Sequence, residues 1–414
     1  MKPLYEMDKK EINDFIFIHL PYSEKGKKED GEVFTPSELI EKMLDDLPSR
    51  VWCDPHLKWL EPTCGVGNFM AIVYFRLMCG LVDWEKDRMK RSNHIIQNML
   101  YMVEKNESNV DICYSIFGNL CNVVCLDFLL FTGKTFKVDK FDVILGNLPF
   151  QSKSCLGGKS KLYEKLTIHC LGFLQESTGY MLLITPDNIF SGGSNVYRKM
   201  LEQHVIIINL DKKNQGYFKG IQQYICYFLV QKCSKTKILD DRMSRIVKND
   251  GTVMSLLLKD RAINPVRNWT EKTEELICKY ISNEKNGVLY NRGKSMENYL
   301  KLLDKGIGLD KPHTLIYTVD KFLYTYDSEL FVGGGIKKVV VFSISTNLEY
   351  KADLSGEYGV GPNTFYIPVG SVEEGQKWVD FLGSEDYKTI ALATKTNRQF
   401  LKNTFIQHLV CPTI

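Results

Sequence analysis

Apolar runs alternate with segments of helical periodicity from about residue 31 to residue 235. Short runs of apolar and β-branched residues predict strands, and the longer amphipathic segments between them predict helices. This alternation is typical of a parallel sheet with crossover helices. The predicted strands are Trp59–Glu61, Leu100–Glu104, Asn122–Leu126, Phe141–Leu145, Tyr180–Thr185, Val205–Leu210 and Tyr224–Gln231. The stretch from Asn93 to Phe117 also fits one long helix, so two interpretations stay open there.

The pattern changes after a basic segment, Lys232 to Lys248, that lacks apolar periodicity. Short strand-like runs, Lys338–Ser343 and Thr364–Pro368, then lie among glycines. A helix follows, opened by the capping box that begins at Ser371. We therefore predict an N-terminal extension over 1–30, an α/β domain over 31–240 and an α+β domain over 241–414.

Composition narrows the class of protein. The 414 residues are 44% hydrophobic and 25% charged, as in soluble globular proteins, and the net charge of +3 predicts only local basic patches for any nucleic acid. The twelve scattered cysteines show neither zinc-site spacing nor a disulfide framework, which favours free thiols in a reducing compartment. The start is too charged for a signal peptide, and no apolar run approaches the ~20 residues of a membrane span. We expect a soluble intracellular protein without a metal.

A glycine segment follows the first predicted strand and reads Glu61-Pro62-Thr63-Cys64-Gly65-Val66-Gly67. Ligands of open α/β sheets bind at the carboxyl ends of the strands. Gly65 and Gly67 let the backbone approach a ligand, and Glu61 can hold a cationic amine beside Pro62. Because the spacing departs from Gly-x-Gly-x-x-Gly, we expect a nucleoside cofactor without a pyrophosphate.

Three further segments carry candidate binding residues. In Phe34-Thr35-Pro36, Thr35 is predicted to cap a helix whose first residue is Pro36, with Glu38 completing a capping box. That is either a helix start alone or a set of backbone donors for a carboxylate. Glu104 is a ribose ligand or an exposed helical glutamate. Asp127 and Phe128 hold an adenine, or are a helix cap and a core phenylalanine.

The segment Asn147-Leu148-Pro149-Phe150 carries the chemistry. Such a tetrapeptide is ordinarily a turn, but here it follows a clean apolar strand. An exocyclic ring amine is a poor nucleophile because its lone pair is delocalised into the ring. The Asn147 side-chain oxygen and the Leu148 carbonyl would accept both its hydrogens, and Phe150 would stack on the ring. The site would work chiefly by alignment, without a metal or a general base.

These segments, in this order, resemble S-adenosylmethionine-dependent N6-adenine DNA methyltransferases of the γ class over roughly residues 31 to 235. The resemblance implies a Rossmann-like sheet of seven strands, mostly parallel, with an antiparallel final strand. It also implies S-adenosyl-L-methionine as cofactor, with Thr35 and Glu61 at its methionine end, Glu104 at its ribose and Asp127 with Phe128 at its adenine. The target adenine would be flipped out of the duplex onto Asn147, Leu148 and Phe150. In Tyr217-Phe218-Lys219, we assign Phe218, before Tyr217, to closing on that base.

The family usually has two prolines where this chain has Leu148-Pro149, so the loop lacks one locked φ, but the carbonyl at position 148 is retained. Double-stranded DNA is the expected partner, and any cognate restriction endonuclease is expected to be a separate protein. Residues 31–240 would be the catalytic domain and 241–414 the DNA target-recognition domain. The candidate phosphate contacts are Lys153, Lys159, Lys161, Lys212, Lys213, Lys219, Arg292, Lys294, Lys395 and Arg398.

Two alternatives stay open. The same tetrapeptide would suit RNA or a protein glutamine amide, although the long C-terminal region favours DNA. A non-catalytic DNA-binding subunit of the same fold is the other, given some weight by Leu148.

Overall fold

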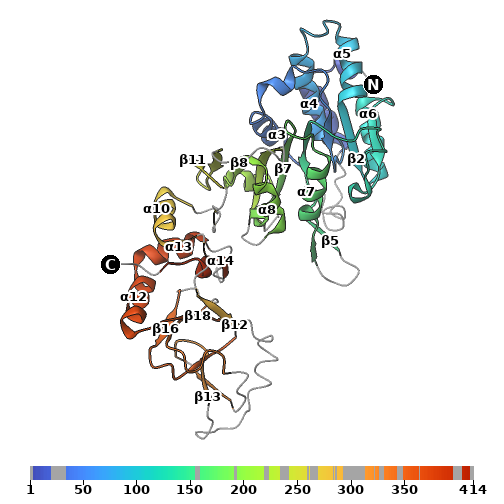
Figure 1. Cartoon of the computed structure of the whole chain (residues 1–414). Coiled ribbons are helices and arrows are strands. Elements are labelled where there is room, and N and C mark those ends of the chain that lie inside the picture. The colour runs from blue at the N-terminus through green and yellow to red at the C-terminus, as the bar shows by residue number, and fades with distance from the viewer. Residues whose placement is uncertain are drawn as a thin grey trace. The chain divides into compact units, whose positions relative to one another are not determined.

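The computed structural model describes residues 3–19, 34–153, 159–190, 194–218, 223–233, 242–258, 261, 269–282, 284, 287–291, 313–320, 322–325, 331–342, 348–362, 364–394 and 403–410. Contacts divide the chain into two compact units (Figure 1). The first unit comprises Met1–Ile189 and Ser194–Lys259, and the second comprises Phe190–Gly193 and Asp260–Ile414.

The first unit is built on a nine-stranded sheet of order β11-β10-β8-β9-β7-β4-β1-β2-β3. Strand β9 is antiparallel to both neighbours, β7 and β8, as predicted for the final strand of the family. All seven predicted strands are present, but the sheet has nine strands and not seven. The strands are β1 Trp59–Glu61, β2 Leu100–Glu104, β3 Asn122–Cys125, β4 Val143–Asn147, β7 Tyr180–Pro186, β8 His204–Asn209, β9 Ile225–Gln231, β10 Ser244–Val247 and β11 Val253–Leu256; a separate hairpin pairs β5 Gln151–Lys153 with β6 Lys159–Lys161.

The two additional strands lie at the predicted domain boundary: β10 is part of the basic segment Lys232 to Lys248, and β11 follows that segment. Strand β10 pairs parallel with β8, and β11 returns antiparallel along β10 after a turn in which Gly251 has a φ of +85°. Each strand is only four residues long, and polar residues interrupt its apolar pattern. The first unit therefore extends to Lys259 rather than ending at residue 240.

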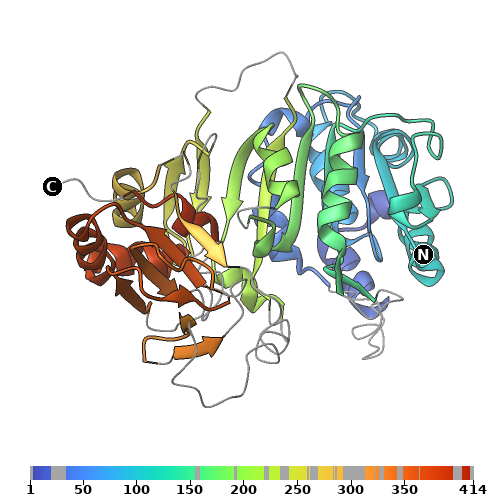
Figure 2. The ribbon, with the colours of Figure 1, turned by 60° about the horizontal axis from the view of Figure 1, so that its bottom comes forward.

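Helices cover both faces of this sheet. Figures 1 and 2 show α7 and α8 over one face, with α3 and α4 over the other. Alternate strand residues, such as Val143 and Leu145, join α3 and α4 in one buried cluster. The helices are α1 Lys9–His19, α3 Ser37–Leu44, α4 Asn68–Gly80, α5 Arg88–His94, α6 Glu107–Phe117, α7 Leu162–Phe173, α8 Asn195–Leu201 and α9 Lys213–Gly216.

The interpretation left open over Asn93 to Phe117 is now decided. One long helix there is wrong, because β2 separates α5 from α6.

The predicted N-terminal extension contains α1, whose Ile12 and Ile16 lie in the main core of the first unit, each 1% exposed.

Chain connectivity places a switch point between β1 and β4. Strand β1 lies between β2 and β4, and both pairings are parallel. The chain leaves β1 toward β2 on one side, while β4 lies on the other side. In open α/β sheets, the crevice at such a reversal is where ligands bind.

The second unit contains a four-stranded sheet of order β12-β18-β15-β16 and a three-stranded sheet of order β14-β13-β17. Ser371 caps α12 as predicted, since its hydroxyl accepts a hydrogen bond from the Glu374 amide, whereas the Glu374 carboxylate accepts from the amide of Gly370 rather than from that of Ser371. The elements are β12 Leu289–Asn291, β13 His313–Ile316, β14 Phe322–Thr325, β15 Lys338–Phe342, β16 Tyr350–Asp353, β17 Gly359–Val360, β18 Thr364–Pro368, α10 Glu271–Tyr280, α12 Val372–Gly383, α13 Glu385–Thr394 and α14 Asn403–Gln407. Over the described residues of both units, none of the helices has the length and apolarity to span a bilayer.

Candidate functional site

The loops that follow β1 and β4 meet at the switch point. The Thr63 hydroxyl donates a hydrogen bond to the Asn147 carbonyl oxygen at 3.3 Å. A Cβ placed on Gly146 would lie 3.5 Å from Cγ of Glu61. The glycine segment and the asparagine segment therefore share one region at the carboxyl edge of the sheet.

The two glycines of the turn after β1 serve different needs. Gly65 and Gly67 both have positive φ, +53° and +83° respectively, which favours glycine. A Cβ on Gly67 would lie 2.8 Å from Cε2 of Phe117, so the packing at this position also leaves no room for a side chain. A Cβ on Gly65 would meet nothing within 4 Å, so the backbone there borders open space.

Glu61 places a buried carboxyl beside this turn. Its side chain is 2% exposed, and Oε2 has no hydrogen-bond partner among the described residues. Burial raises the pKa of Glu61 well above its ordinary value, with a further increase from Cys113 and then from Glu104, against a lowering by the Met70 backbone. The carboxyl thus lacks the positive partner that would stabilise its ionised form.

Glu104 ends β2 and connects it to the glycine turn. Its Oε2 accepts a hydrogen bond from the Gly65 amide at 2.8 Å, and its Oε1 accepts one from the Asn106 amide at 2.8 Å. The side chain is 6% exposed. The alternative of an exposed helical glutamate is therefore wrong, because Glu104 is a buried residue at the end of a strand.

Asn147 is oriented by Thr35. Its Nδ2 donates a hydrogen bond to Oγ1 of Thr35 at 3.1 Å. The predicted capping box at Thr35 does not form. Helix α3 begins at Ser37 with Pro36 as N-cap and without a side-chain cap, because the Thr35 hydroxyl contacts Asn147 instead. The preceding residue, Phe34, is 39% exposed.

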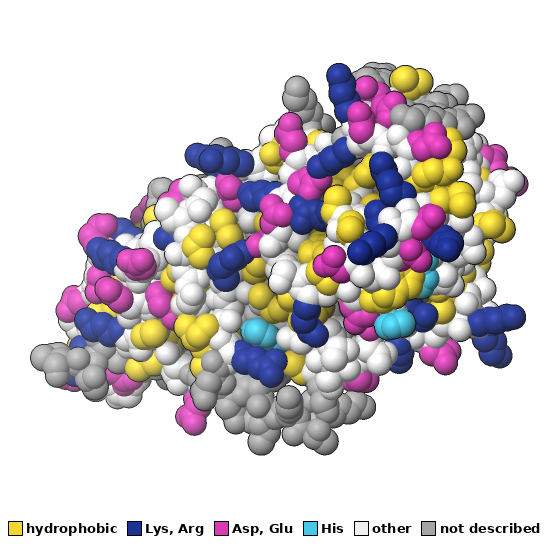
Figure 3. Space-filling model, turned by 90° about the horizontal axis from the view of Figure 1, so that it is seen from above, with side chains coloured by type: hydrophobic (Ala, Val, Ile, Leu, Met, Phe, Trp, Pro, Cys, Tyr) yellow, Lys and Arg dark blue, Asp and Glu magenta, His cyan; other side chains and the backbone are white. Residues whose placement is uncertain are grey.

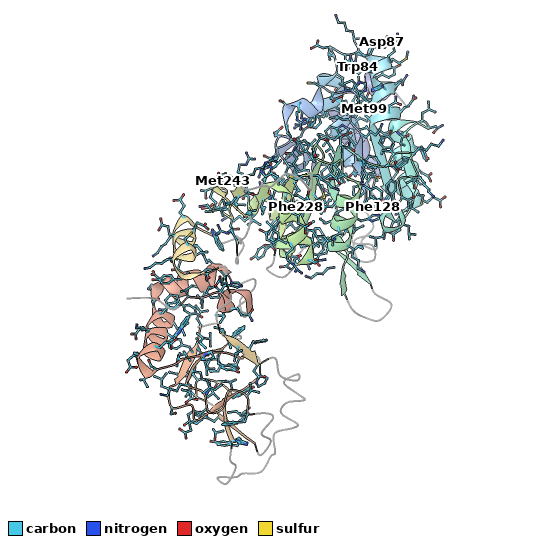
Figure 4. All side chains as sticks on the ribbon, viewed as in Figure 1. Trp84, Asp87, Met99, Phe128, Phe228 and Met243 are labelled. Carbon is cyan, nitrogen blue, oxygen red and sulfur yellow. The ribbon has the colours of Figure 1, made fainter. Side chains whose placement is uncertain are left out.

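Asp127 and Phe128 adopt the geometry of the structural alternative. The exposed Asp127 caps the short helix Phe128–Leu130 and accepts a hydrogen bond from the Leu129 amide at 2.9 Å. Phe128, which is labelled in Figure 4, is 2% exposed. Its ring stacks on that of Phe131, with the centroids 5.4 Å apart. A role in holding an adenine stays a prediction for both residues.

The aromatic residues predicted around the target base lie against the main core. Phe150 is half-buried there, whereas Leu148 is 1% exposed and its amide donates to the Ile184 carbonyl at 3.3 Å. Phe218 is 2% exposed inside the same core cluster, and Tyr217 is the more exposed of the two aromatics. The assignment of Phe218 to closing on a base stays a prediction.

Three of the ten predicted phosphate contacts have side chains that the structure describes. Lys161 is exposed and pairs with Glu164 at 2.9 Å, and Lys212 and Lys213 are exposed. Figure 3 shows basic side chains interspersed with acidic and apolar ones on the face in view. The described residues include no group of three side chains that could bind a metal. Outside the described residues or side chains lie Lys153, Lys159, Lys219, Arg292, Lys294, Lys395 and Arg398.

Sequence reasoning missed the residues that support Asn147. Thr63 lies inside the glycine segment, and Asn68 donates from Nδ2 to the Thr35 carbonyl at 2.5 Å. The polar type of Thr63 was the available signal, whereas Asn68 reads as an ordinary first residue of a helix. Only the tertiary fold brings these side chains to Thr35 and Asn147.

Comparisons with known proteins place this geometry in context. No protein-family model matches the chain. An uncharacterized adenine-specific methylase of Mycoplasma pneumoniae is 40% identical over 75 residues, which are 17% of this chain and 18% of that protein. The match therefore spans less than a fifth of the curated relative.

Two solved structures are similar to the chain. The type IIL restriction–modification enzyme MmeI, solved in complex with DNA, aligns with a TM-score of 0.53 at 11% identity, over 94% of this chain and 69% of that chain. A proposed class I S-adenosylmethionine-dependent methyltransferase of Listeria monocytogenes aligns with a TM-score of 0.42 at 13% identity, over 60% of this chain and 75% of that chain. The alignment with MmeI shows a similarity of fold.

Proposed function

We propose that this protein is an S-adenosylmethionine-dependent methyltransferase that modifies the N6 amino group of a flipped-out adenine in a specific duplex DNA sequence. The observation that carries the proposal is the meeting of Glu61 and the glycine turn with Asn147 at the β1/β4 switch point. The segment similar to an adenine-specific methylase and the MmeI-like fold support it. The order of the segments favours the γ class, and a cognate endonuclease would be a separate protein.

The residues at the switch point fit the cofactor. The Glu61 oxygen without a partner is suited to a positive group, which would offset the unfavourable burial of the carboxylate. Gly65 borders open space, and Glu104, whose carboxylate holds the Gly65 amide, is proposed as the acceptor for a ribose hydroxyl. When bound, S-adenosylmethionine supplies an electrophilic methyl group. Contacts to it are further proposed for Phe34, Thr35, Pro62, Gly67, Asp127 and Phe128.

Residues of the chain would prepare the amino group of the base. The Asn147 side-chain oxygen and the Leu148 carbonyl accept its two hydrogens, which concentrates electron density on the nitrogen. Phe150 stacks on the ring and Pro149 stiffens the loop. Alignment of the reacting atoms is worth up to ~7–11 kcal/mol in favourable cases. Extracting the base requires a few kcal/mol, which phosphate contacts and the second unit would offset.

Methyl transfer to defined substrates tests the proposal. The purified protein is incubated with radiolabelled S-adenosylmethionine and duplex DNA, RNA or a protein extract, and the products are digested and separated. We expect label in N6-methyladenine from DNA. Label in RNA or in glutamine would overturn the substrate assignment, and cofactor binding without any transfer would indicate a non-catalytic subunit.

Replacing Asn147 tests the assigned chemistry. Asn147→Ala should reduce turnover by at least about 100-fold, because the amino group loses an acceptor and its alignment. The dissociation constant for S-adenosylmethionine, measured by calorimetry, should stay within about threefold. Asn98→Ala, an exposed asparagine outside the site, is the matched control. Unchanged turnover in Asn147→Ala would refute the role given to Asn147.

A further inference from the structure

We infer that Thr35 is a positioning residue for Asn147 and that helix α3, which follows Thr35, is fixed at its other end by polar contacts on the same face of the sheet. This inference rests on the proposed function and adds a role for Thr35 beyond contact with a cofactor. It is carried by one hydrogen bond at the site and by a second set of polar contacts at the other end of α3.

At the site, Asn147 is held by one contact to its side chain and one to its backbone. Its side-chain Nδ2 donates to Oγ1 of Thr35 at 3.1 Å, and its backbone carbonyl oxygen accepts from the Thr63 hydroxyl at 3.3 Å. Thr35 is itself fixed, because it is 4% exposed and its carbonyl accepts from Nδ2 of Asn68. Since the side-chain amide is planar, fixing Nδ2 also fixes the direction of Oδ1.

The opposite end of α3 is anchored on the same face of the sheet. Asp46, two residues beyond this helix, accepts a hydrogen bond from the Tyr227 hydroxyl at 2.9 Å and also pairs with Arg245. Oη of Tyr227 accepts in turn from Nδ2 of Asn209 at 2.8 Å. Within α3, Lys42 pairs with Asp211 at 3.5 Å.

Strand register relates the two ends of α3. Asn147 pairs with Ile184, Ile184 pairs with Tyr227, and Tyr227 pairs with Asn209. Residues directly opposite each other on neighbouring strands present their side chains on one face. The segment from Thr35 to Asp46 therefore bridges two polar positions, Asn147 and Tyr227, of a single row across four strands. Between these two positions, the apolar residues Leu39, Ile40 and Met43 of α3 are buried, which fixes the helix on the sheet.

A positioning role and a cofactor-holding role have different kinetic consequences. If Thr35 acts through Asn147, loss of its hydroxyl lowers kcat even when the enzyme is saturated with S-adenosylmethionine. If Thr35 only binds the cofactor, the affinity falls and kcat at saturating cofactor is retained. Misplacing a reacting group by about 1 Å can reduce the rate by about 100-fold, so a decrease in kcat of about 10- to 100-fold is expected.

The test uses the full chain with three substitutions. Thr35→Val removes the hydroxyl at constant shape, Thr35→Ser retains it, and Thr167→Val makes the same change at a buried threonine of α7 whose hydroxyl donates to the Tyr163 carbonyl of the same helix. We measure kcat at saturating cofactor, the dissociation constant for S-adenosylmethionine and the Tm. We expect reduced kcat at saturating cofactor for Thr35→Val, recovery of kcat in Thr35→Ser relative to Thr35→Val, and wild-type behaviour for Thr167→Val.

Several results would overturn the inference. These are wild-type kcat in Thr35→Val, or a loss of affinity with kcat retained at saturating cofactor. A second readout needs no activity, namely the side-chain amide resonance of Asn147 in ¹⁵N-TROSY spectra, assigned by its absence in Asn147→Ala. Thr35→Val should shift this resonance and speed its hydrogen exchange, and Thr167→Val should not. An unshifted resonance refutes the contact, whereas absence of methyl transfer by the wild type refutes the proposed function alone.

Discussion

At the scale of the residue, Glu61 combines a requirement of the proposed site with an unfavourable contribution to folding. Burial raises its pKa well above its ordinary value, and its Oε2 lacks a partner among the described residues. A carboxyl whose pKa is higher in the folded state than in the unfolded state stabilises the fold while it is protonated. That contribution is lost as the pH rises through the folded-state pKa. Above that pH, ionised Glu61 destabilises the protein without ligand.

Glu61→Gln should therefore stabilise the unliganded protein above the raised pKa and weaken cofactor binding. The amide keeps the shape of the carboxyl without its charge. If the change is worth about 1 kcal/mol, the Tm of the first unit rises by about 2–4 °C at pH 8, and the advantage disappears at pH 4. Calorimetry should show affinity for S-adenosylmethionine reduced by at least tenfold. A lower Tm at pH 8, or undiminished affinity, would contradict this account of Glu61.

At the scale of the element, α3 is held by apolar burial along its length and by polar contacts at its ends. Leu39, Ile40, Met43 and Leu44 are buried in the main core. The Tyr227 hydroxyl joins Asp46 to Asn209 in a mostly buried network. Buried polar groups that lose one partner incur the desolvation penalty of the group left behind. The polar contacts therefore specify where the ends of α3 lie.

Tyr227→Phe should lower the free energy of unfolding by about 1–3 kcal/mol, because Asp46 and Asn209 each lose a partner. Urea denaturation monitored by circular dichroism measures this change. The matched control is Tyr387→Phe, since the buried Tyr387 hydroxyl has no hydrogen-bond partner among the described residues. An equal loss of stability in both variants would mean that the Asp46–Tyr227–Asn209 network contributes nothing specific.

At the scale of the whole molecule, the sheet determines where the first unit can end. Strands β10 and β11 continue the sheet beyond β8, and Arg245 of β10 pairs with Asp46. A chain ended after Asp240 would leave an edge of β8 unpaired, which favours aggregation. A chain ended after Lys259 would keep the nine-stranded sheet complete.

Two truncations compare these boundaries. Residues 1–259 should be monodisperse in size-exclusion chromatography, should bind S-adenosylmethionine, and should lack sequence-specific methylation of DNA. Residues 1–240 should aggregate or unfold at a Tm at least several degrees lower. Equal behaviour of the two fragments would show that β10 and β11 are dispensable, and specific methylation by residues 1–259 would refute target recognition by the second unit.

The sequence by itself determined the strand ends that carry the candidate chemistry. The strand predictions at Trp59–Glu61 and Leu100–Glu104 agree with the structure residue for residue, because buried parallel strands are short uninterrupted apolar runs. The glycines and carboxyls that follow these strands were identifiable because their chemistry is local. Because the carboxyl ends of parallel strands lie at one edge of a sheet, the predicted parallel order already assigned the glycine and asparagine segments to the same edge.

Only the tertiary structure decided what those side chains contact. The Thr35 hydroxyl contacts Asn147 and does not cap α3, because the fold brings Asn147, a residue distant in sequence, next to it. Strand β10 pairs with the edge that β8 offers, and β11 pairs in turn with β10, which the polar sequences of these two strands do not indicate. Local patterns record the burial of a segment, whereas the partner of a polar group depends on how the whole sheet assembles.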